Sequence, residues 1–230
     1  MHDFDLTWRQ KLSDKIEARA GTTTRDEILP ENVDPTHAVR ELDVIGWTRV
    51  VMNRMACSLD MQTSRDIMSD CACHYPEDQL KPMRALYETT GDLQQVHAAL
   101  QNEFETFLRE ILHLDETMIA EVVNRGWGSA GVLDGDTIIA TKIPKSGYLR
   151  EYLQESDPEV RRSMYCHCPR VRDAVGTGEE LPRIYCYCGA GFYKHMWETI
   201  LQDEIEIEVL ESVLSGGEVC KVAIRLPAGL

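Results

Sequence analysis

Hydrophobic and polar residues alternate strictly along residues 204–209, and in residues 220–226 one face carries the apolar residues Cys220, Val222, Ile224 and Leu226. A period of two places every second side chain on the same face, which is typical of a strand with one buried face. Two glycines, Gly216 and Gly217, lie between these segments and suit a tight turn. The pattern therefore predicts an antiparallel hairpin near the end of the chain.

The register of this hairpin depends on the centre of its turn. A turn centred on residues 215–216 pairs Val209 with Val222 and Glu211 with Cys220, whereas a turn one residue later shifts the partners by two and keeps the faces. In either register Glu211 and Cys220 point to the apolar face, where a carboxylate costs free energy unless a partner satisfies it. Glu211 is therefore a candidate site residue, and escape of its carboxylate to solvent past the strand end is the alternative.

Apolar residues recur at helical spacing through the first half of the chain. Asp92 and Asp115 stand where N-caps are expected, and Gly21 and Gly126 stand where helices are expected to stop. Thr36 is predicted to cap the second helix, after a polar connector that contains two prolines. The predicted helices cover residues 6–20, 36–56, 61–70, 79–90, 92–112 (as one helix or broken) and 115–125.

The pattern changes after Gly126. Asp134 and Gly135 suit a hairpin turn into a following strand. Gly189 and Gly191, which precede the last predicted helix, allow another backbone to approach closely. The expected elements are a strand at 137–143, a helix at 147–155, a polar turn around Pro158 and a helix at 192–201.

Helices followed by short strands predict an α+β fold, in which a helical N-terminal half packs on a small antiparallel sheet that ends in a strand–hairpin–strand. We expect residues 1–126 to form a helical region, residues 127–230 to form a Cys-rich α+β region, and both to be parts of one integrated domain. Residues 126–131 match the GxGxxG pattern. Because this match follows a helix and no βαβ unit surrounds it, dinucleotide binding is not expected.

Composition narrows the classes of function. The 230 residues carry 24 Lys and Arg against 39 Asp and Glu, and the formal charge of −15 argues against nucleic acid or an anionic membrane as a partner. The N-terminal segment lacks the apolar core of a signal peptide, and no apolar run reaches the roughly 18 residues that span a bilayer. We therefore expect a cytoplasmic protein, in which thiols stay reduced.

Two copies of Tyr-Cys-x-Cys stand twenty residues apart and supply Cys166, Cys168, Cys186 and Cys188. One or two free cysteines are ordinary core residues, but four in paired spacing favour thiolate ligands for a metal ion. Zinc is the expected metal, and an iron–sulfur cluster is the alternative cofactor. The alternative interpretations of these four cysteines are a redox-active or disulfide-forming pair and inert core residues. On a regular strand the thiols of one pair would lie about 7 Å apart, so a shared ion would require a bend.

Further donors lie outside the two pairs. Cys57, Cys71, Cys73 and His74 form a second set of sulfur and nitrogen donors. This set is expected either to bind a metal of its own or to contribute thiols to the first site. Cys220, at the start of the last strand, is expected to complete either set.

Basic and aromatic residues accompany the Cys pairs. Arg170 and Arg172 follow the first pair in an otherwise acid-rich chain, where positive charge would favour thiolates or attract a carboxylate ligand. Together with Tyr185 and Tyr187 they are candidates to line a ligand pocket, and the alternative for the arginines is a solvated surface. His195, on the helix after the second pair, is a candidate base, with an ordinary core or surface histidine as the alternative.

Three stretches carry a resemblance to known families: YCHCP at residues 165–169, YCYCGAGFYK at residues 185–194 and LSGGEVCKVAI at residues 214–224. With their surroundings, roughly residues 148–227, they resemble a bacterial Cys-rich family of unknown function. The helix, strand, glycine turn and terminal Cys are more distantly similar to two other groups. These are the 4-vinyl reductase ligand-binding domain, an α+β sensor fold that often carries a Cys-ligated zinc, and the L-2-amino-thiazoline-4-carboxylate hydrolase-like family.

The more distant similarity implies a zinc site. Glu211 and Cys220 fall on the positions of a Glu and a terminal Cys in the 4-vinyl reductase pattern. That domain often has a further Cys at the place of residues 212–214, where this chain has none. The remaining ligands would therefore come from the two Cys-x-Cys pairs.

Together these features predict a cytoplasmic small-molecule-binding protein with a Cys-thiolate zinc site. The alternative is a metal- or thiol-dependent hydrolase or lyase that acts on a small sulfur- or nitrogen-containing acid, with Glu211 or His195 as the catalytic base. A structural, partner-binding module is a third class. The sequence also leaves a homodimer open.

Overall fold

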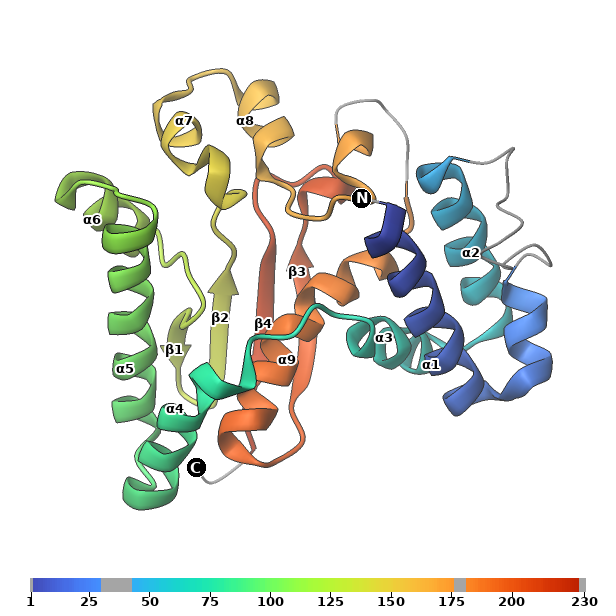
Figure 1. Ribbon diagram of the computed structural model, residues 1–230, viewed down its shortest axis with the longest axis horizontal. Coiled ribbons are helices and arrows are strands. Elements are labelled where there is room, and N and C mark those ends of the chain that lie inside the picture. Colours follow the sequence, from blue (N-terminus) through green and yellow to red (C-terminus); the bar gives the residue numbers. More distant parts are fainter. Residues whose placement is uncertain (1, 30–42, 176–180, 228–230) are drawn as a thin grey trace.

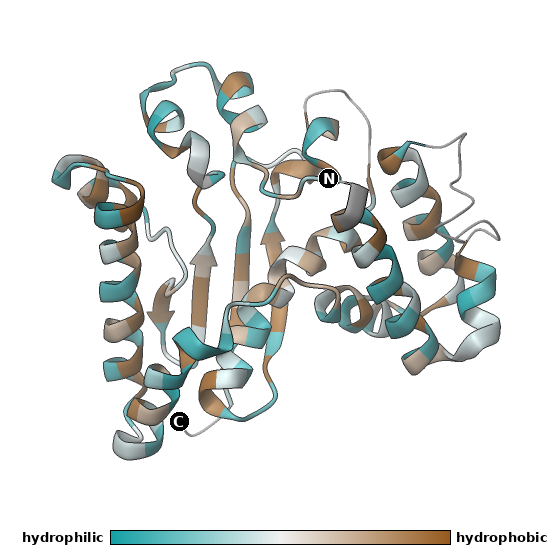
Figure 2. Cartoon of the chain, viewed as in Figure 1, coloured by the Kyte–Doolittle hydropathy of each residue, from teal (hydrophilic) through white to brown (hydrophobic). Residues whose placement is uncertain are grey.

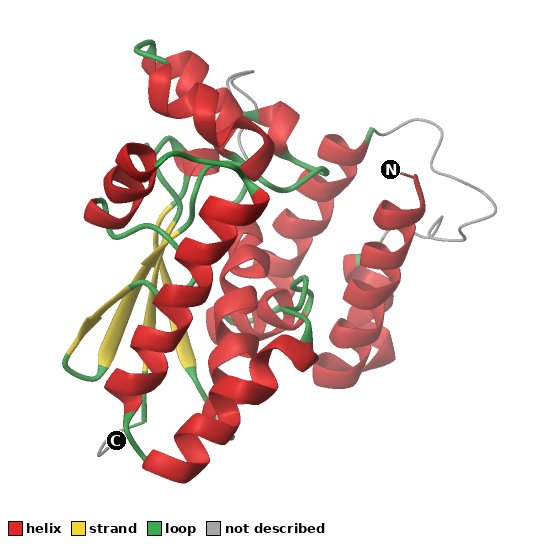
Figure 3. Cartoon of the chain, turned by 60° about the vertical axis from the view of Figure 1, so that its left-hand side comes forward, coloured by secondary structure: helices red, strands yellow, loops and turns green. Residues whose placement is uncertain are grey.

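The computed structural model describes residues 2–29, 43–175 and 181–227. It confirms the α+β class: helices form the first half of the chain, and an antiparallel sheet lies in the second half (Figure 1). The sheet lies at one edge of the molecule in the view of Figure 3, with most of the helices to one side of it. The helices are α1 His2–Ile28, α2 Val44–Ser58, α3 Met61–Asp70, α4 Glu77–Thr90, α5 Leu93–Thr106, α6 Glu116–Asn124, α7 Leu149–Gln154, α8 Pro158–Tyr165 and α9 Tyr187–Leu201.

The sheet confirms the predicted hairpins. Its four strands follow the order β1-β2-β4-β3, and each neighbouring pair is antiparallel. Val209 pairs with Val222, as expected for a turn centred on residues 215–216. A bulge after Val209 then places Glu211 opposite Lys221 instead of Cys220. The strands are β1 Val132–Asp134, β2 Thr137–Thr141, β3 Glu206–Glu211 and β4 Lys221–Arg225.

Apolar side chains of the strands and of the helices form the core. Figure 2 marks the hydrophobic positions in brown, and they occur along both the strands and the helices. One cluster of buried residues includes Leu12 and Met52 from the first half and Trp197 and Ile224 from the second. Burial of such side chains is the dominant favourable term in folding. Within the described segments, every helix is too short or too polar to cross a bilayer.

Helix α9 lies at the centre of the structure and contacts α3, α4 and β3. It starts at Tyr187, five residues earlier than predicted, so Cys188 belongs to its first turn. The predicted close approach is confirmed at Gly191, where an added Cβ would lie only 2.0 Å from the carbonyl oxygen of Ser69 in α3. The missing side chain lets the two helix backbones come into contact.

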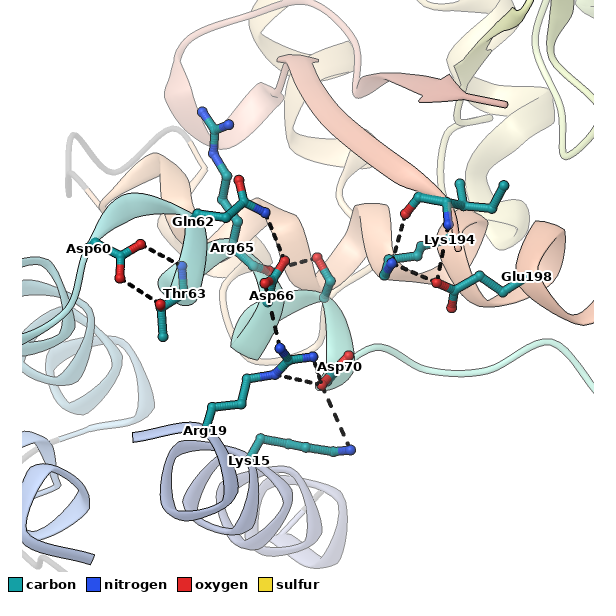
Figure 4. Close-up of polar contacts among 12 residues, drawn as sticks. Lys15, Arg19, Asp60, Gln62, Thr63, Arg65, Asp66, Asp70, Lys194 and Glu198 are labelled. Carbon is teal, nitrogen blue, oxygen red and sulfur yellow. Dashed lines mark hydrogen bonds and ion pairs between the residues drawn. The ribbon is translucent and has the colours of Figure 1, made fainter. Parts of the chain in front are cut away.

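Helix α1 consists of two helical segments. The backbone at Gly21 adopts φ 86° and ψ 164°, which is not helical, so the predicted stop at Gly21 is confirmed, and a second segment continues beyond the kink to Ile28. Figure 4 shows how α1 docks on α3: Arg19 pairs with Asp70 at 2.9 Å and with Asp66 at 3.5 Å, and Lys15 approaches Asp70 at 3.9 Å. Since these pairs are partly solvated, each contributes little, and burial of apolar residues of α1 carries most of the docking.

Several predicted boundaries are confirmed and others shift. Asp92 and Asp115 cap α5 and α6 as predicted, whereas the predicted cap Thr36 lies outside the described residues and Asp43 caps α2. The polar turn expected around Pro158 is wrong, because Pro158 opens α8 at a position where its missing N–H costs nothing. The shorter helical turns are η1 Phe107–Ile111 (π-helical, continuing α5), η2 Ser146–Tyr148, η3 Arg172–Ala174, η4 Arg183–Cys186 and η5 Val213–Ser215.

A thiol-lined cavity as the candidate functional site

A cavity of about 980 Å³ lies among the start of α1, the α4–α5 pair, α9 and the sheet. Its lining is mostly apolar and aromatic. Phe4 and Trp8 come from α1, Phe104 comes from α5, and Val209 and Val222 come from the two strands of the terminal hairpin. A largely apolar cavity with a few polar groups is the usual form of a small-molecule site, and this volume is at the upper end of that class.

Cysteine thiols are the distinctive groups of the lining. The two Cys-x-Cys pairs enter it from different backbone settings: Cys166 directly after α8, Cys168 in the following turn, Cys186 in η4 and Cys188 in α9. None of these four residues lies on a strand. The first pair follows the end of α8, and the second pair spans η4 and the first turn of α9. The strand geometry considered from the sequence therefore does not apply to either pair. The cysteines of the lining are Cys73, Cys166, Cys168, Cys186, Cys188 and Cys220.

The second predicted donor set is divided between several places. Cys73 joins the cavity, whereas Cys71 is buried behind it and accepts, through its carbonyl oxygen, a 3.5 Å hydrogen bond from the Cys188 thiol. Cys57 is exposed on α2 and is not part of the lining. The ring of His74 stacks on the ring of His195, with centroids 3.9 Å apart. Of the four donors in this set, only Cys73 lines the cavity.

All eight cysteines are free thiols. In the part of the chain that the structure describes, no group of three or more His, Cys, Asp or Glu residues is arranged so that it could hold a metal ion. The thiols therefore share a cavity without forming a ready-made coordination shell. A metal held by four of them would require these side chains to move together.

Burial raises the pKa of several thiols in the lining. It raises the pKa of Cys166 and of Cys186 to about 12 and that of Cys188 to about 11. The indole of Trp8 donates a 3.3 Å hydrogen bond to the Cys188 sulfur and partly offsets this rise in pKa. Burial also raises the pKa of Cys71 and of Cys220. Near neutral pH the side chains of Cys166, Cys186 and Cys188 are therefore neutral, weakly polar S–H groups.

We expect the free energy of unfolding to fall as the pH rises from about 9 towards 12. An unfolded thiol loses its proton near its ordinary pKa of 9, whereas the buried thiols hold theirs up to about pH 12, so alkali favours the unfolded chain. Replacing Cys186 with alanine should reduce this slope by up to about 1.4 kcal/mol per pH unit. Urea titrations at several pH values measure it, with the exposed Cys57→Ala as the control. If the pH dependence of stability is unchanged in Cys186→Ala, the raised pKa of the Cys186 thiol is not its cause.

One wall of the cavity rests on a buried polar network. The Cys168 sulfur lies 3.1 Å from the Tyr185 hydroxyl, which also accepts a 3.5 Å hydrogen bond from the Arg170 guanidinium. Arg170 pairs with Asp5 at 2.6 Å and lies over the Trp8 ring, 3.8 Å from its centroid. Arg170 therefore stands behind the wall and positions two of its residues.

Of the four residues predicted to line a ligand pocket, Tyr185 lines this cavity. Arg170, Arg172 and Tyr187 are not part of the lining. Arg172 lies 3.8 Å from Asp173, and Tyr187 is buried. The sequence had placed the arginines beside the thiols correctly but could not show which way their side chains turn.

The two predicted catalytic residues lie in different settings. Glu211 lines the cavity, and its Oε1 accepts hydrogen bonds from the backbone amides of Glu218 at 2.7 Å and Val219 at 3.1 Å. The inward carboxylate that the hairpin pattern predicted is thus satisfied by the hairpin's own loop. His195 stacks on His74 and is not part of the lining.

We expect Glu211→Ala to lower the free energy of unfolding by about 1–2 kcal/mol, because two loop amides lose a charged acceptor. Glu211→Gln should lose less, since its amide oxygen can still accept. Urea unfolding of both variants tests this, with Glu208→Ala on the same strand as the control for an exposed carboxylate. Equal losses in Glu211→Ala and Glu208→Ala would contradict a role for Glu211 in holding the loop.

Sequence reasoning missed two lining residues of consequence, Trp8 and Lys142. For Trp8 the sequence indicated only an apolar position in an amphipathic helix. Lys142 lies directly after β2, and its backbone amide donates a 2.9 Å hydrogen bond to the carbonyl of Cys220. Pairing of the predicted 137–143 strand with the terminal strand would have placed Lys142 beside Cys220, but the sequence did not reveal that pairing.

A family model described as a family of unknown function (DUF6144) matches residues 153–228. The matched segment contains both Cys-x-Cys pairs, α9 and the terminal hairpin. This finding fits the expected similarity to a family of unknown function over the Cys-rich part of the chain. No curated protein and no solved structure matches the chain. The similarity to 4-vinyl reductase and thiazoline hydrolase-like domains therefore stays a prediction.

Proposed function

We propose that this protein binds a small, largely apolar molecule in the cavity. The observation that carries the proposal is the cavity itself: about 980 Å³ of space with an aromatic and aliphatic lining and six cysteine thiols. Core packing in proteins normally leaves few voids larger than a water molecule. A space of this size, with apolar walls, is instead what a binding site for a small molecule requires.

We favour ligand binding over hydrolysis as the function because the predicted catalytic groups are hydrogen-bonded or protonated. Oε1 of Glu211 is engaged by two backbone amides, and the thiols of Cys166 and Cys186 are protonated near neutral pH. A general base or a thiolate nucleophile has to be free to take or release a proton. The neutral thiols instead offer polarisable contacts to an apolar ligand.

Binding can be tested with N-phenyl-1-naphthylamine, an uncharged apolar probe whose fluorescence rises in apolar surroundings. We expect saturable binding of one probe per chain. The probe should slow the alkylation of Cys73 by iodoacetamide at least tenfold, because Cys73 is exposed and also lines the cavity. Mass spectrometry of the labelled peptides measures the rate.

Cys57 provides the control within the same chain, since it is exposed on α2 and outside the cavity lining. Its alkylation rate should not change when the probe is added. Absence of saturable binding, or binding that leaves Cys73 and Cys57 equally reactive, would overturn the proposal.

Zinc is a separate proposal, supported by the donor chemistry alone: the sulfur donors that line one cavity include Cys166, Cys168, Cys186, Cys188 and Cys220. Elemental analysis of protein purified without air or added metal tests it, together with the visible spectrum. About one zinc per chain, lost in Cys166→Ser/Cys186→Ser and kept in Cys57→Ser, is the expected result. Iron with sulfide and a brown colour would replace zinc with a cluster. Protein without metal would leave the cavity proposal standing and overturn this one.

A further inference from the structure

Lys142 stands out among the residues of the cavity wall. Among the described lining residues it is the only Lys or Arg. The other charged side chains of the lining are acidic, namely Glu103, Glu110 and Glu211. A lone cationic side chain in a mostly apolar cavity is an obvious point of recognition for a ligand.

The backbone of Lys142 is held firmly where β2 ends. Its amide donates a 2.9 Å hydrogen bond to the carbonyl oxygen of Cys220, and its carbonyl oxygen accepts the hydroxyl of Tyr165. The ammonium reaches the first turn of α9, since a Cβ added at Gly189 would lie 3.2 Å from Nζ. The side chain therefore has a defined base and ends against the wall that carries Cys186 and Cys188.

The ammonium of Lys142 has no counter-charge from the part of the chain that the structure describes. No carboxylate there lies within ion-pair distance of Nζ, and Glu211, which also lines the cavity, directs its Oε1 to two loop amides. The neighbouring thiols are neutral near pH 7. Partial burial of an unpaired ammonium costs free energy, which an anionic ligand group would recover.

We infer that the cavity selects amphipathic anions, with an apolar body against the aromatic wall and a single carboxylate against Lys142. The inference rests on the proposed function and specifies its ligand class. The net charge of −15 repels anions at long range, so the selectivity must arise locally at the Lys142 ammonium. It follows that removing this one ammonium group should abolish the preference for the anion.

The test compares decanoate with decan-1-ol, two chains of equal length that differ in the head group. Displacement of N-phenyl-1-naphthylamine at pH 8 gives both dissociation constants. We expect decanoate to bind at least tenfold more tightly than decan-1-ol. Lys142→Met should reduce this ratio to about one by weakening decanoate binding, and Lys142→Arg should keep the preference.

Lys145→Met is the matched control, because Lys145 lies three residues further along and is not part of the lining. It should retain the full preference for decanoate. Equal binding of the two ligands, or a preference that survives Lys142→Met, would overturn the inference and leave the binding function intact. Failure of the naphthylamine probe to bind would instead overturn the proposed function.

Discussion

Replacing Gly191 with alanine is expected to lower the free energy of unfolding by about 3 kcal/mol, the upper range for overpacking a tight interior. The added Cβ would lie 2.0 Å from the carbonyl oxygen of Ser69 and 2.7 Å from its carbonyl carbon. These are backbone atoms of α3, so no side chain can rotate away. The two helices must separate, although alanine by itself favours a helix over glycine by about 1 kcal/mol.

Gly189→Ala provides the control in the same helix. Its Cβ would meet only the far end of the Lys142 side chain, at 3.2 Å, and that end can shift. Urea unfolding should therefore find Gly189→Ala at least as stable as the wild type. Because α9 carries Cys188 and several cavity residues, Gly191→Ala should also weaken binding of the naphthylamine probe. A Gly191→Ala protein of unchanged stability would show that α3 and α9 do not pack this closely.

Asp5→Asn is expected to destabilise the protein by about 3 kcal/mol, the lower range for breaking a buried ion pair by removing one partner. The carboxylate of Asp5 pairs with Arg170 at 2.6 Å and with Arg9 at 2.8 Å, and the Arg170 side chain is only 1% exposed. Without the carboxylate, two guanidinium groups face each other with no anion between them. Burial and the charge of Arg170 already lower the pKa of Arg9.

A double-mutant cycle tests whether the uncompensated charge of Arg170 causes this loss of stability. Arg170→Met in the Asp5→Asn background removes the uncompensated buried charge, so the double variant should be no less stable than Asp5→Asn alone. Asp78→Asn is the control, because the Asp78–Lys81 pair lies in solvent and its loss should not be measurable. Strictly additive losses at Asp5 and Arg170 would refute the pair as a coupled unit.

Local chemistry explains why much of the fold was predictable. The hairpin follows from alternation in residues 204–209 and 220–226, and the caps Asp92 and Asp115 satisfy the first amides of the helices that they precede. One error comes from a signal with two local outcomes. Pro158 can occupy a turn or the first turn of a helix. Packing of the neighbouring elements decides between these outcomes.

The candidate site was predictable in composition but not in geometry. The two Cys-x-Cys motifs, Cys166 with Cys168 and Cys186 with Cys188, identified four residues that line the cavity. Nothing in the spacing indicated that a helix would begin at Tyr187. Because of this helix, the thiols of Cys186 and Cys188 point in other directions than they would on a strand.

By itself the sequence determined the α+β class, the terminal hairpin, the close approach at Gly191 and the identity of the thiol-bearing segments, because periodicity, capping and side-chain size act over a few neighbouring residues. Only the tertiary structure decided that Arg170 turns away from the cavity towards Asp5, that loop amides satisfy Glu211, and that Lys142 meets the Cys pairs. These contacts join residues far apart along the chain, and their directions depend on how α1, α9 and the sheet pack together.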